Sequence, residues 1–173
     1  MPEQKGIYSI IPVSPHTHYT PAEGGQIKSQ GLDDSIVYSG FRVYRAAVQS
    51  ILAITDTIIE FTNITYDPLS MFNTSTYKFT CPYDGMWKLS VYLTIGSVDV
   101  HRQLNIKFIN ELGAIISQCW RPLVGGTGVN SVSFEDTQQL NVGDTIRVQV
   151  LCNVDLGLQN GADKTFFTAR WYL

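Results

Sequence analysis

The stretch "FTNITYDPLSMFNTSTYKFTCPYDGMWKLSV", residues 61–91, decides how this chain folds. It spaces large aromatic side chains between turn-forming residues, and it ends in a run where apolar and polar residues alternate. Over residues 86–95 the large apolar side chains, beginning with Trp87 and Leu89, fall on one side, and Lys88 begins the other side. A period of two residues predicts a β-strand with one buried face.

Three more segments alternate in the same way: "QLNIKFI" (103–109), "IRVQVLC" (146–152) and "TFFTARWYL" (165–173). In the first of them Leu104, Ile106 and Phe108 share one face, with Asn105 and Lys107 on the other. No segment shows a convincing 3.6-residue period of an amphipathic helix. Short strands separated by turn residues predict an all-β chain, folded as an antiparallel sandwich or jelly roll.

Aromatic side chains also fall on strand faces opposite the core. Phe166 and Tyr172 lie opposite the buried set of the last strand, and Tyr92 lies opposite that of residues 86–95. An outer face that carries aromatic residues is typical of an oligomer interface. Scattered surface aromatics are also common, so the alternative is three unrelated exposed side chains. Together with the resemblance described next, the pattern favours an interface.

Five residues of the opening stretch keep the intervals of a known signature: Phe61, Asp67, Phe72, Phe79 and Gly85. With the opening "FRVYRA" (41–46) and the turn in "LNVGDTIRVQV" (140–150), they resemble the globular head of complement component 1q, a family related in fold to tumour necrosis factor. Trp87, Leu89 and Val91 depart from the family's aromatic alternation, but they suit a buried strand face.

The resemblance implies a ten-stranded jelly roll with neighbouring termini, assembled as a tight homotrimer through an aromatic-rich interface. We expect this head domain to span residues 41–173. Residues 1–40 hold four of the seven prolines, and polar residues interrupt their apolar runs. This composition predicts an extended N-terminal anchoring arm or linker.

The arm carries two histidines one residue apart, His16 and His18, within "PHTHYTPAEGGQI" (15–27). Alternate residues of an extended segment point the same way, so three parallel chains would bring six imidazoles to one axis. Six nitrogen ligands suit iron, or alternatively nickel or zinc. The segment also resembles the His-x-His motif of phage tail fibres, in which three copies clasp an axial iron ion. The alternative is a pair of solvated loop histidines without metal.

Charge and motif content exclude several function classes. A net charge of −3 with 12 lysines and arginines argues against a nucleic-acid groove and against a basic membrane-surface helix. No apolar run approaches the length that spans a bilayer. No nucleophile elbow, phosphate-binding loop or metalloprotease motif occurs, so we expect no enzymatic activity.

Smaller polar features receive structural interpretations. Five aspartates fall in turn-like contexts and are interpreted as backbone caps, with calcium binding as a minor alternative: Asp67, Asp84, Asp136, Asp144 and Asp163. The widely spaced Cys81, Cys119 and Cys152 predict reduced thiols. We expect "GGTG" (125–128) to form a hairpin loop, and we expect His101 to lie on the surface.

Taken together, these expectations predict that the chain is a virion structural protein of a bacteriophage. Residues 1–40 would anchor in a capsid, tail or fibre protein, and the trimeric knob would stand on the virion surface as capsid decoration, head fibre or tail-fibre tip. Loops "GSVDVHR" (96–102) and "VGGTGVN" (124–130) would contact a host-surface glycan or protein. The expected lack of an export signal fits a protein made in the host cytoplasm. The alternative is a soluble or cell-surface lectin-like head of non-viral origin.

Overall fold

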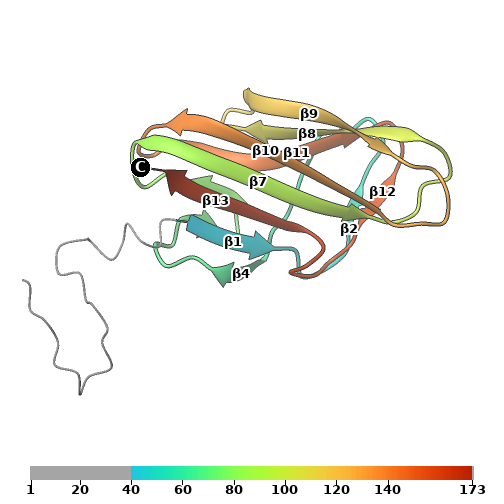
Figure 1. Cartoon of the computed structure of the whole chain (residues 1–173), viewed down its shortest axis with the longest axis horizontal. Coiled ribbons are helices and arrows are strands. Elements are labelled where there is room, and N and C mark those ends of the chain that lie inside the picture. Colours follow the sequence, from blue (N-terminus) through green and yellow to red (C-terminus); the bar gives the residue numbers. More distant parts are fainter. Residues whose placement is uncertain (1–39, 173) are drawn as a thin grey trace, which may run out of the picture. The chain divides into compact units, whose positions relative to one another are not determined.

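The structure, a computed structural model, describes residues 40–172 as two antiparallel sheets (Figure 1). The first sheet consists of β1 (Gly40–Tyr44), β2 (Gln49–Ile51), β4 (Asn63–Tyr66), β7 (Gly85–Ile95), β10 (Asn130–Leu140), β12 (Leu156–Leu158) and β13 (Phe166–Tyr172). The second consists of β3 (Thr57–Ile58), β5 (Phe72–Asn73), β6 (Lys78–Thr80), β8 (Arg102–Ile109), β9 (Ile115–Leu123) and β11 (Thr145–Cys152).

The pairing order confirms the predicted jelly-roll sandwich. The first sheet runs β2-β12-β7-β13-β1-β4 with β10 beside β7, and the second runs β5-β6-β11-β8-β9 with β3 beside β11. Residues 40–172 form thirteen strands, three more than the ten that the resemblance implies. Gly40 pairs with Arg170, so the head begins and finishes at one end of the sandwich. Within residues 40–172, no helix is long and apolar enough to cross a membrane.

The strand expected over residues 86–95 is β7, the centre of the first sheet. It pairs with β10 along its whole length and with β13 on its other side. Its core-facing side chains are no more than 1% exposed: Trp87, Leu89, Val91, Leu93 and Ile95. The period-two prediction is therefore confirmed for this strand.

The aromatic residues of the opening stretch meet in the core between the sheets. The Phe72 ring centroid lies 5.4 Å from that of Phe41 and 6.3 Å from that of Phe61. The Phe79 and Phe167 centroids each lie 5.1 Å from that of Phe41. Aromatic pairs of this kind contribute about 0.5–1.5 kcal/mol each beyond the area they bury. The spacing of the signature is thus a packing pattern that joins the two sheets.

The two other signature residues control the backbone. Asp67 accepts hydrogen bonds from the amides of Met71 at 2.9 Å and Phe72 at 2.8 Å, which fixes the turn before β5. Gly85 begins β7 with a φ of 146°, in a region that residues with a side chain rarely adopt. A Cβ at this position would lie 2.2 Å from Nε1 of Trp171, so the close approach of the two strands requires glycine.

The outer side of β8 is covered, although its residues are polar. Asn105 and Lys107 are 4% and 6% exposed. Lys107 Nζ donates to Asp56 Oδ1 at 2.5 Å, and Asn105 Nδ2 donates to Gln118 Oε1 at 3.0 Å. The segment between β2 and β3 therefore reaches across this side, a long-range contact that strand periodicity does not contain.

Turn chemistry explains some of the predicted aspartate caps. Asp84 accepts a hydrogen bond from the Val142 amide at 2.6 Å, and Asp144 accepts one from the Asn141 amide at 2.7 Å. Asp136 instead lies inside β10, so the turn interpretation is wrong at that position. Asp136 lies on the side of β10 that carries the core residue Phe134, and its carboxylate accepts a hydrogen bond from Nε2 of Gln138 at 2.7 Å.

Candidate self-association face and distal pocket

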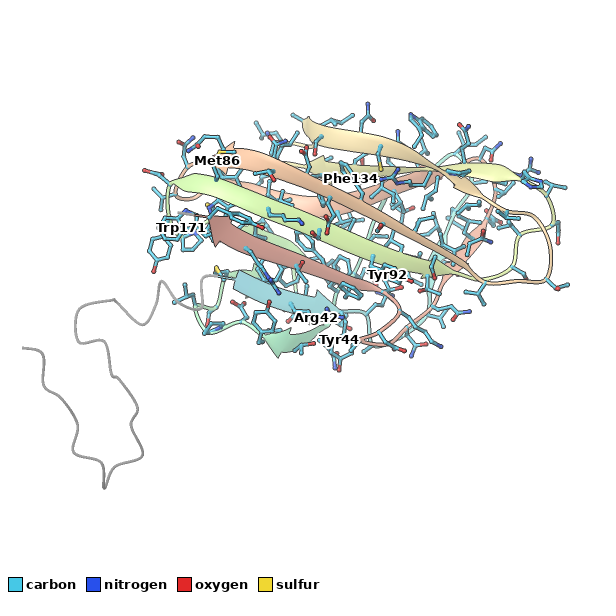
Figure 2. All side chains as sticks on the ribbon, in the orientation of Figure 1. Arg42, Tyr44, Met86, Tyr92, Phe134 and Trp171 are labelled. Atoms are coloured by element: carbon cyan, nitrogen blue, oxygen red, sulfur yellow. The ribbon has the colours of Figure 1, made fainter. Side chains whose placement is uncertain are left out.

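The three aromatic residues predicted for an interface lie on the outward side of the first sheet. Figure 2 shows this sheet, with Tyr92 on β7 and Arg42 on β1. We define the aromatic face by the outward side chains of β1, β7, β10 and β13: Arg42, Lys88, Ser90, Tyr92, Glu135, Phe166, Thr168, Arg170 and Tyr172.

A stack of three side chains forms one end of the aromatic face. Tyr92 and Phe166 are cross-strand partners, and their ring centroids lie 5.3 Å apart with planes at 12°. The guanidinium carbon of Arg42 lies 3.7 Å from the Phe166 centroid, which is a cation–π contact. Arg42 also donates to the carbonyl of Ala162 at 2.7 Å. The stack is therefore held in one arrangement before any partner arrives.

Tyr172 lies at the other end of the aromatic face. It is 50% exposed beside its cross-strand partner Met86, which is 41% exposed. Six residues of strand separate it from Phe166, a distance of about 20 Å. The predicted residues therefore share one face but form two aromatic ends and no single cluster.

A polar groove of ≈ 260 Å³ lies between the two ends. Glu135 accepts hydrogen bonds from Lys88 at 2.9 Å and Ser90 at 2.8 Å. These contacts hold the pKa of Glu135 below its ordinary value, and the hydrogen bond to Glu135 raises the pKa of Lys88. The sequence gives no sign of this pairing, because Lys88 and Glu135 belong to strands far apart in the chain.

The two loops predicted to bind a partner meet at the opposite end of the sandwich from Gly40 and Tyr172 (Figure 1). Gly126 donates its amide to the Val98 carbonyl at 2.7 Å, which joins the loop after β7 to the loop after β9. A Cβ on Gly125 would lie 2.7 Å from the Val100 backbone. The hairpin interpretation of "GGTG" is wrong, because β9 and β10 belong to different sheets and this loop crosses between them.

A pocket of ≈ 590 Å³ lies beside these loops. We define this distal pocket by its lining residues: Ile54, His101, Arg102, Gln103, Trp120, Pro122, Leu123, Leu151, Cys152 and Asn153. Trp120 is 53% exposed. His101 is the residue that the sequence predicts as a surface histidine. Sequence reasoning missed the pocket as a whole, because its walls come from four separate segments.

The histidines and cysteines considered as metal ligands form no metal site within the described residues. His16 and His18 lie outside the described residues. Within residues 40–172, no three His, Cys, Asp or Glu side chains come close enough to hold a metal ion. Cys81, Cys119 and Cys152 are unpaired, and burial raises the pKa of Cys81 to about 11 and also raises that of Cys119. These two thiols are therefore protonated at neutral pH and are poor nucleophiles.

Comparison with known proteins gives similarity in fold. No protein-family model matches the chain, and no curated protein sequence matches it. Among solved structures, murine APRIL at pH 8.0 superposes with a TM-score of 0.59 at 14% identity, covering 78% of this chain and 98% of that one.

Two further structures extend the similarity to other animals. Eiger TNF from S. frugiperda gives a TM-score of 0.57 at 13% identity over 78% of this chain and 92% of that one. The globular domain of zebrafish complement 1qA gives 0.54 at 14% identity over 78% and 98%. The fold of the complement 1q and tumour necrosis factor heads is therefore shown, and at this level of identity the likeness shows nothing beyond the fold.

Proposed function

We propose that this chain assembles as a homotrimer through the aromatic face and serves as a recognition head. The observation that carries the proposal is the pre-ordered stack of Tyr92, Phe166 and Arg42 on the outward side of the first sheet. Aromatic residues and arginine are enriched at the centres of protein interfaces. The similar fold of the complement 1q and tumour necrosis factor heads supports the same use of the sheet.

The arrangement of the ends suits display. The head joins residues 1–40 at Gly40, beside the end of β13. The loops after β7 and β9 lie at the other end, where they are bridged by Val98 and Gly126. In a trimer with parallel chains, three copies of these loops would face away from the anchoring end. Repeated weak contacts from three such copies give much higher avidity than one contact.

We propose further that the head belongs to the surface of a bacteriophage virion, as capsid decoration or as a tail-fibre tip, with no catalytic role. The support is the His-Thr-His pattern of residues 16–18 and its likeness to phage fibre segments. Antibodies raised against the head should label intact particles in electron micrographs. Labelling of uninfected cells instead would favour the non-viral, lectin-like head.

The proposed metal site adds a separate test of the arm. His16 and His18 of three chains would ligate one iron, nickel or zinc ion. Elemental analysis of the purified full-length trimer should find one such ion for three chains. The paired change His16→Ala and His18→Ala should remove the ion. A trimer without bound metal would contradict the proposed metal site of the two histidines. It would not contradict the proposed trimeric head.

The test of assembly is sedimentation equilibrium on variants of the full chain. The change Tyr92→Ser with Phe166→Ser removes the stack, and each truncation of an interface aromatic costs about 2 kcal/mol or more, which is about 30-fold in affinity. The wild type should sediment as three chains, and the double variant as one at the same concentration. Leu112→Ser is the control, because Leu112 is 92% exposed in a turn away from the aromatic face. A double variant that stays trimeric would overturn the proposed interface.

A further inference from the structure

The side chains around Trp120 in the distal pocket come from three neighbouring strands of the second sheet. Asn105 of β8 pairs with Trp120 of β9 and with Leu151 of β11, and Gln103 of β8 pairs with Pro122 of β9. Paired residues and alternate residues of a strand point the same way, so these five side chains share the outward side of the sheet. All of them except Asn105 line the pocket, whose volume of ≈ 590 Å³ suits a small molecule.

The charged side chain of Arg102 belongs to the other side of β8. Arg102 shares the core side with Leu104 and with its strand partner Leu123, and its Nε has no accessible surface. Among the described residues that line the pocket there is no lysine, aspartate or glutamate. The surroundings of the open indole therefore favour an uncharged ligand over an ion.

Two amides supply the hydrogen-bonding groups of the pocket. Gln103 and Asn153 both line it, and both are exposed. Gln103 is the diagonal neighbour of Trp120 across β8 and β9, a separation of about 7–8 Å. A ligand that covers the indole therefore covers this amide too, and it must replace the hydrogen bonds that the amide makes with water. A primary amide both donates and accepts, which matches a row of hydroxyl groups.

Ile54 forms a further wall of the pocket from the segment after β2. Its φ is 57°, a conformation that β-branched residues rarely adopt, and its side chain is 81% exposed. The Ile54 amide donates to the Cys152 carbonyl at 2.7 Å, which holds this segment against the end of β11. Strained backbone of this kind is concentrated at ligand sites. Here it presents an aliphatic side chain to the pocket without burying it in the core.

We propose that the distal pocket binds a neutral pyranose, the terminal ring of a glycan. The C–H face of the ring lies on Trp120, its hydroxyls bond to the amides of Gln103 and Asn153, and Ile54 contacts its edge. The inference deepens the proposed recognition role, and it rests on that role for the view that the ring belongs to a glycan. All the lining residues come from one chain, so the pocket does not depend on the trimer.

Two other ligand classes use less of the pocket. A flat aromatic compound covers Trp120, but it leaves the amides of Gln103 and Asn153 without the hydrogen bonds that water gave them. An acidic sugar has the same ring and hydroxyls, but its carboxylate finds no cation on the outward side of β8 beside the indole. The neutral pyranose matches the indole and the amides and carries nothing that the pocket leaves unpaired.

The test is an NMR titration of the full-length chain at slightly alkaline pH, read from the indole N–H signals of its three tryptophans. The Trp120 signal is the one that is missing from Trp120→Ala. The Trp87 signal is the internal reference, because Trp87 is 0% exposed on the core side of β7. Four probes are compared: methyl β-D-glucopyranoside, methyl β-D-galactopyranoside, methyl β-D-glucuronide and phenol. The methyl group of each glycoside stands for the bond to the rest of a glycan.

At least one neutral glycoside should shift the Trp120 signal and leave the Trp87 signal in place. A dissociation constant of about 1 mM is expected for a single ring. The glucuronide should bind no more tightly than the glucopyranoside, and phenol about fivefold more weakly because it makes fewer hydrogen bonds. A Trp120 signal that neither neutral glycoside moves, or tighter binding of the glucuronide or phenol, would overturn the proposal.

Variants connect the binding to the named side chains. Trp120→Ala should weaken the neutral glycoside about tenfold or more, and Gln103→Ala about fivefold. Gln139→Ala is the matched control, because Gln139 is exposed on β10 of the first sheet and does not line the pocket. It should change the affinity less than about twofold. Unchanged binding by Gln103→Ala would contradict the assignment even if Trp120→Ala does not fold.

Ile54→Gly separates a role in binding from a role in folding. Glycine adopts a φ of 57° without strain, so the Tm should stay within about 2 °C of that of the wild type. The affinity for the neutral glycoside should fall about fivefold, because the aliphatic wall is removed. A lower Tm with unchanged affinity would show that Ile54 serves the fold and contradict its place in the site.

The same titration separates this inference from the proposed function. The monomeric Tyr92→Ser, Phe166→Ser variant should keep the binding of the neutral glycoside, because its distal pocket is intact. A wild-type chain that is monomeric yet binds the glycoside would reject the trimer and support the pocket. A trimer whose Trp120 signal does not move would support the assembly and reject the pocket.

Discussion

The aromatic face and the distal pocket differ in how their side chains are partnered. On the aromatic face Glu135 accepts hydrogen bonds from both Lys88 and Ser90, and Arg42 is stacked on Phe166. In the distal pocket no carboxylate lines the site, and the indole of Trp120 is left 53% exposed.

The difference indicates what each surface can meet. When a large partner excludes water, a charge that already has its counter-ion costs less to bury than a charge that has none, so the Lys88–Glu135 pair makes this surface better suited to another protein chain. A concave site with a half-exposed indole gains from a small ligand that covers the ring. The account therefore assigns self-association to the first surface and ligand binding to the second.

The largest expected effect is a loss of overall stability, which would disrupt the aromatic face and the distal pocket together. Gly85→Ala places a Cβ against Trp171 at a φ of 146°. Strained backbone and overpacking together should cost about 3 kcal/mol of unfolding free energy and lower the Tm by about 10 °C. Differential scanning calorimetry measures this change. Gly128→Ala is the control, since nothing lies within 4 Å of a Cβ there, and its Tm should stay close to that of the wild type.

A smaller loss of stability is expected from a change near the distal pocket that leaves the aromatic face intact. Asp56→Ala leaves the buried Lys107 ammonium without its partner on the side of β8 near the pocket. We expect a loss of about 1–2 kcal/mol in unfolding free energy, measured by urea titration, because a buried unpaired charge is costly while Asp56 itself is half-exposed. Trimer formation should not change.

The control for Asp56→Ala is a comparable pair in an exposed position. Glu111→Ala breaks the ion pair with Lys78, in which the Glu111 side chain is 59% exposed. The urea midpoint of this variant should match that of the wild type, because exposed ion pairs contribute little. Equal losses of unfolding free energy in Asp56→Ala and Glu111→Ala would show that burial of Lys107 does not strengthen its ion pair.

The smallest effect sharpens the description of the aromatic face. Because Lys88 and Ser90 lower the pKa of Glu135 from its ordinary value of 4.5, this carboxylate stabilises the fold above pH 4.5. The contribution is lost as the pH falls through the lowered pKa. Glu135→Gln should therefore reduce the Tm by about 2 °C at neutral pH and by progressively less in acid. A Tm difference that is constant down to pH 2 would contradict the pairing.

The strands and the core were predictable because they rest on local patterns. The alternation over residues 86–95 determines β7, and the spacing from Phe61 to Gly85 reflects the phenylalanine core and the approach of Trp171. The outward placement of Phe166 and Tyr172 follows from the same period of two. A period along one strand requires no knowledge of the other strands.

The pocket and the burial of Lys107 were not predictable in this way. The pocket walls come from the segment after β2 and from the ends of β8, β9 and β11. The partner of Lys107, Asp56, lies on a different segment that crosses the second sheet. The hairpin prediction for the "GGTG" loop is wrong for the same reason, since turn residues do not reveal whether two strands share a sheet. Side-chain contacts between distant segments depend on topology.

The central claim is that three copies of this chain meet through the aromatic face. Native mass spectrometry of the full-length, untagged protein over a series of dilutions tests it most directly. The account predicts a mass of three chains that persists on dilution to low micromolar concentration. A mass of one chain at every concentration would contradict it, because the ordered stack of Tyr92 and Phe166 would then have no partner to meet.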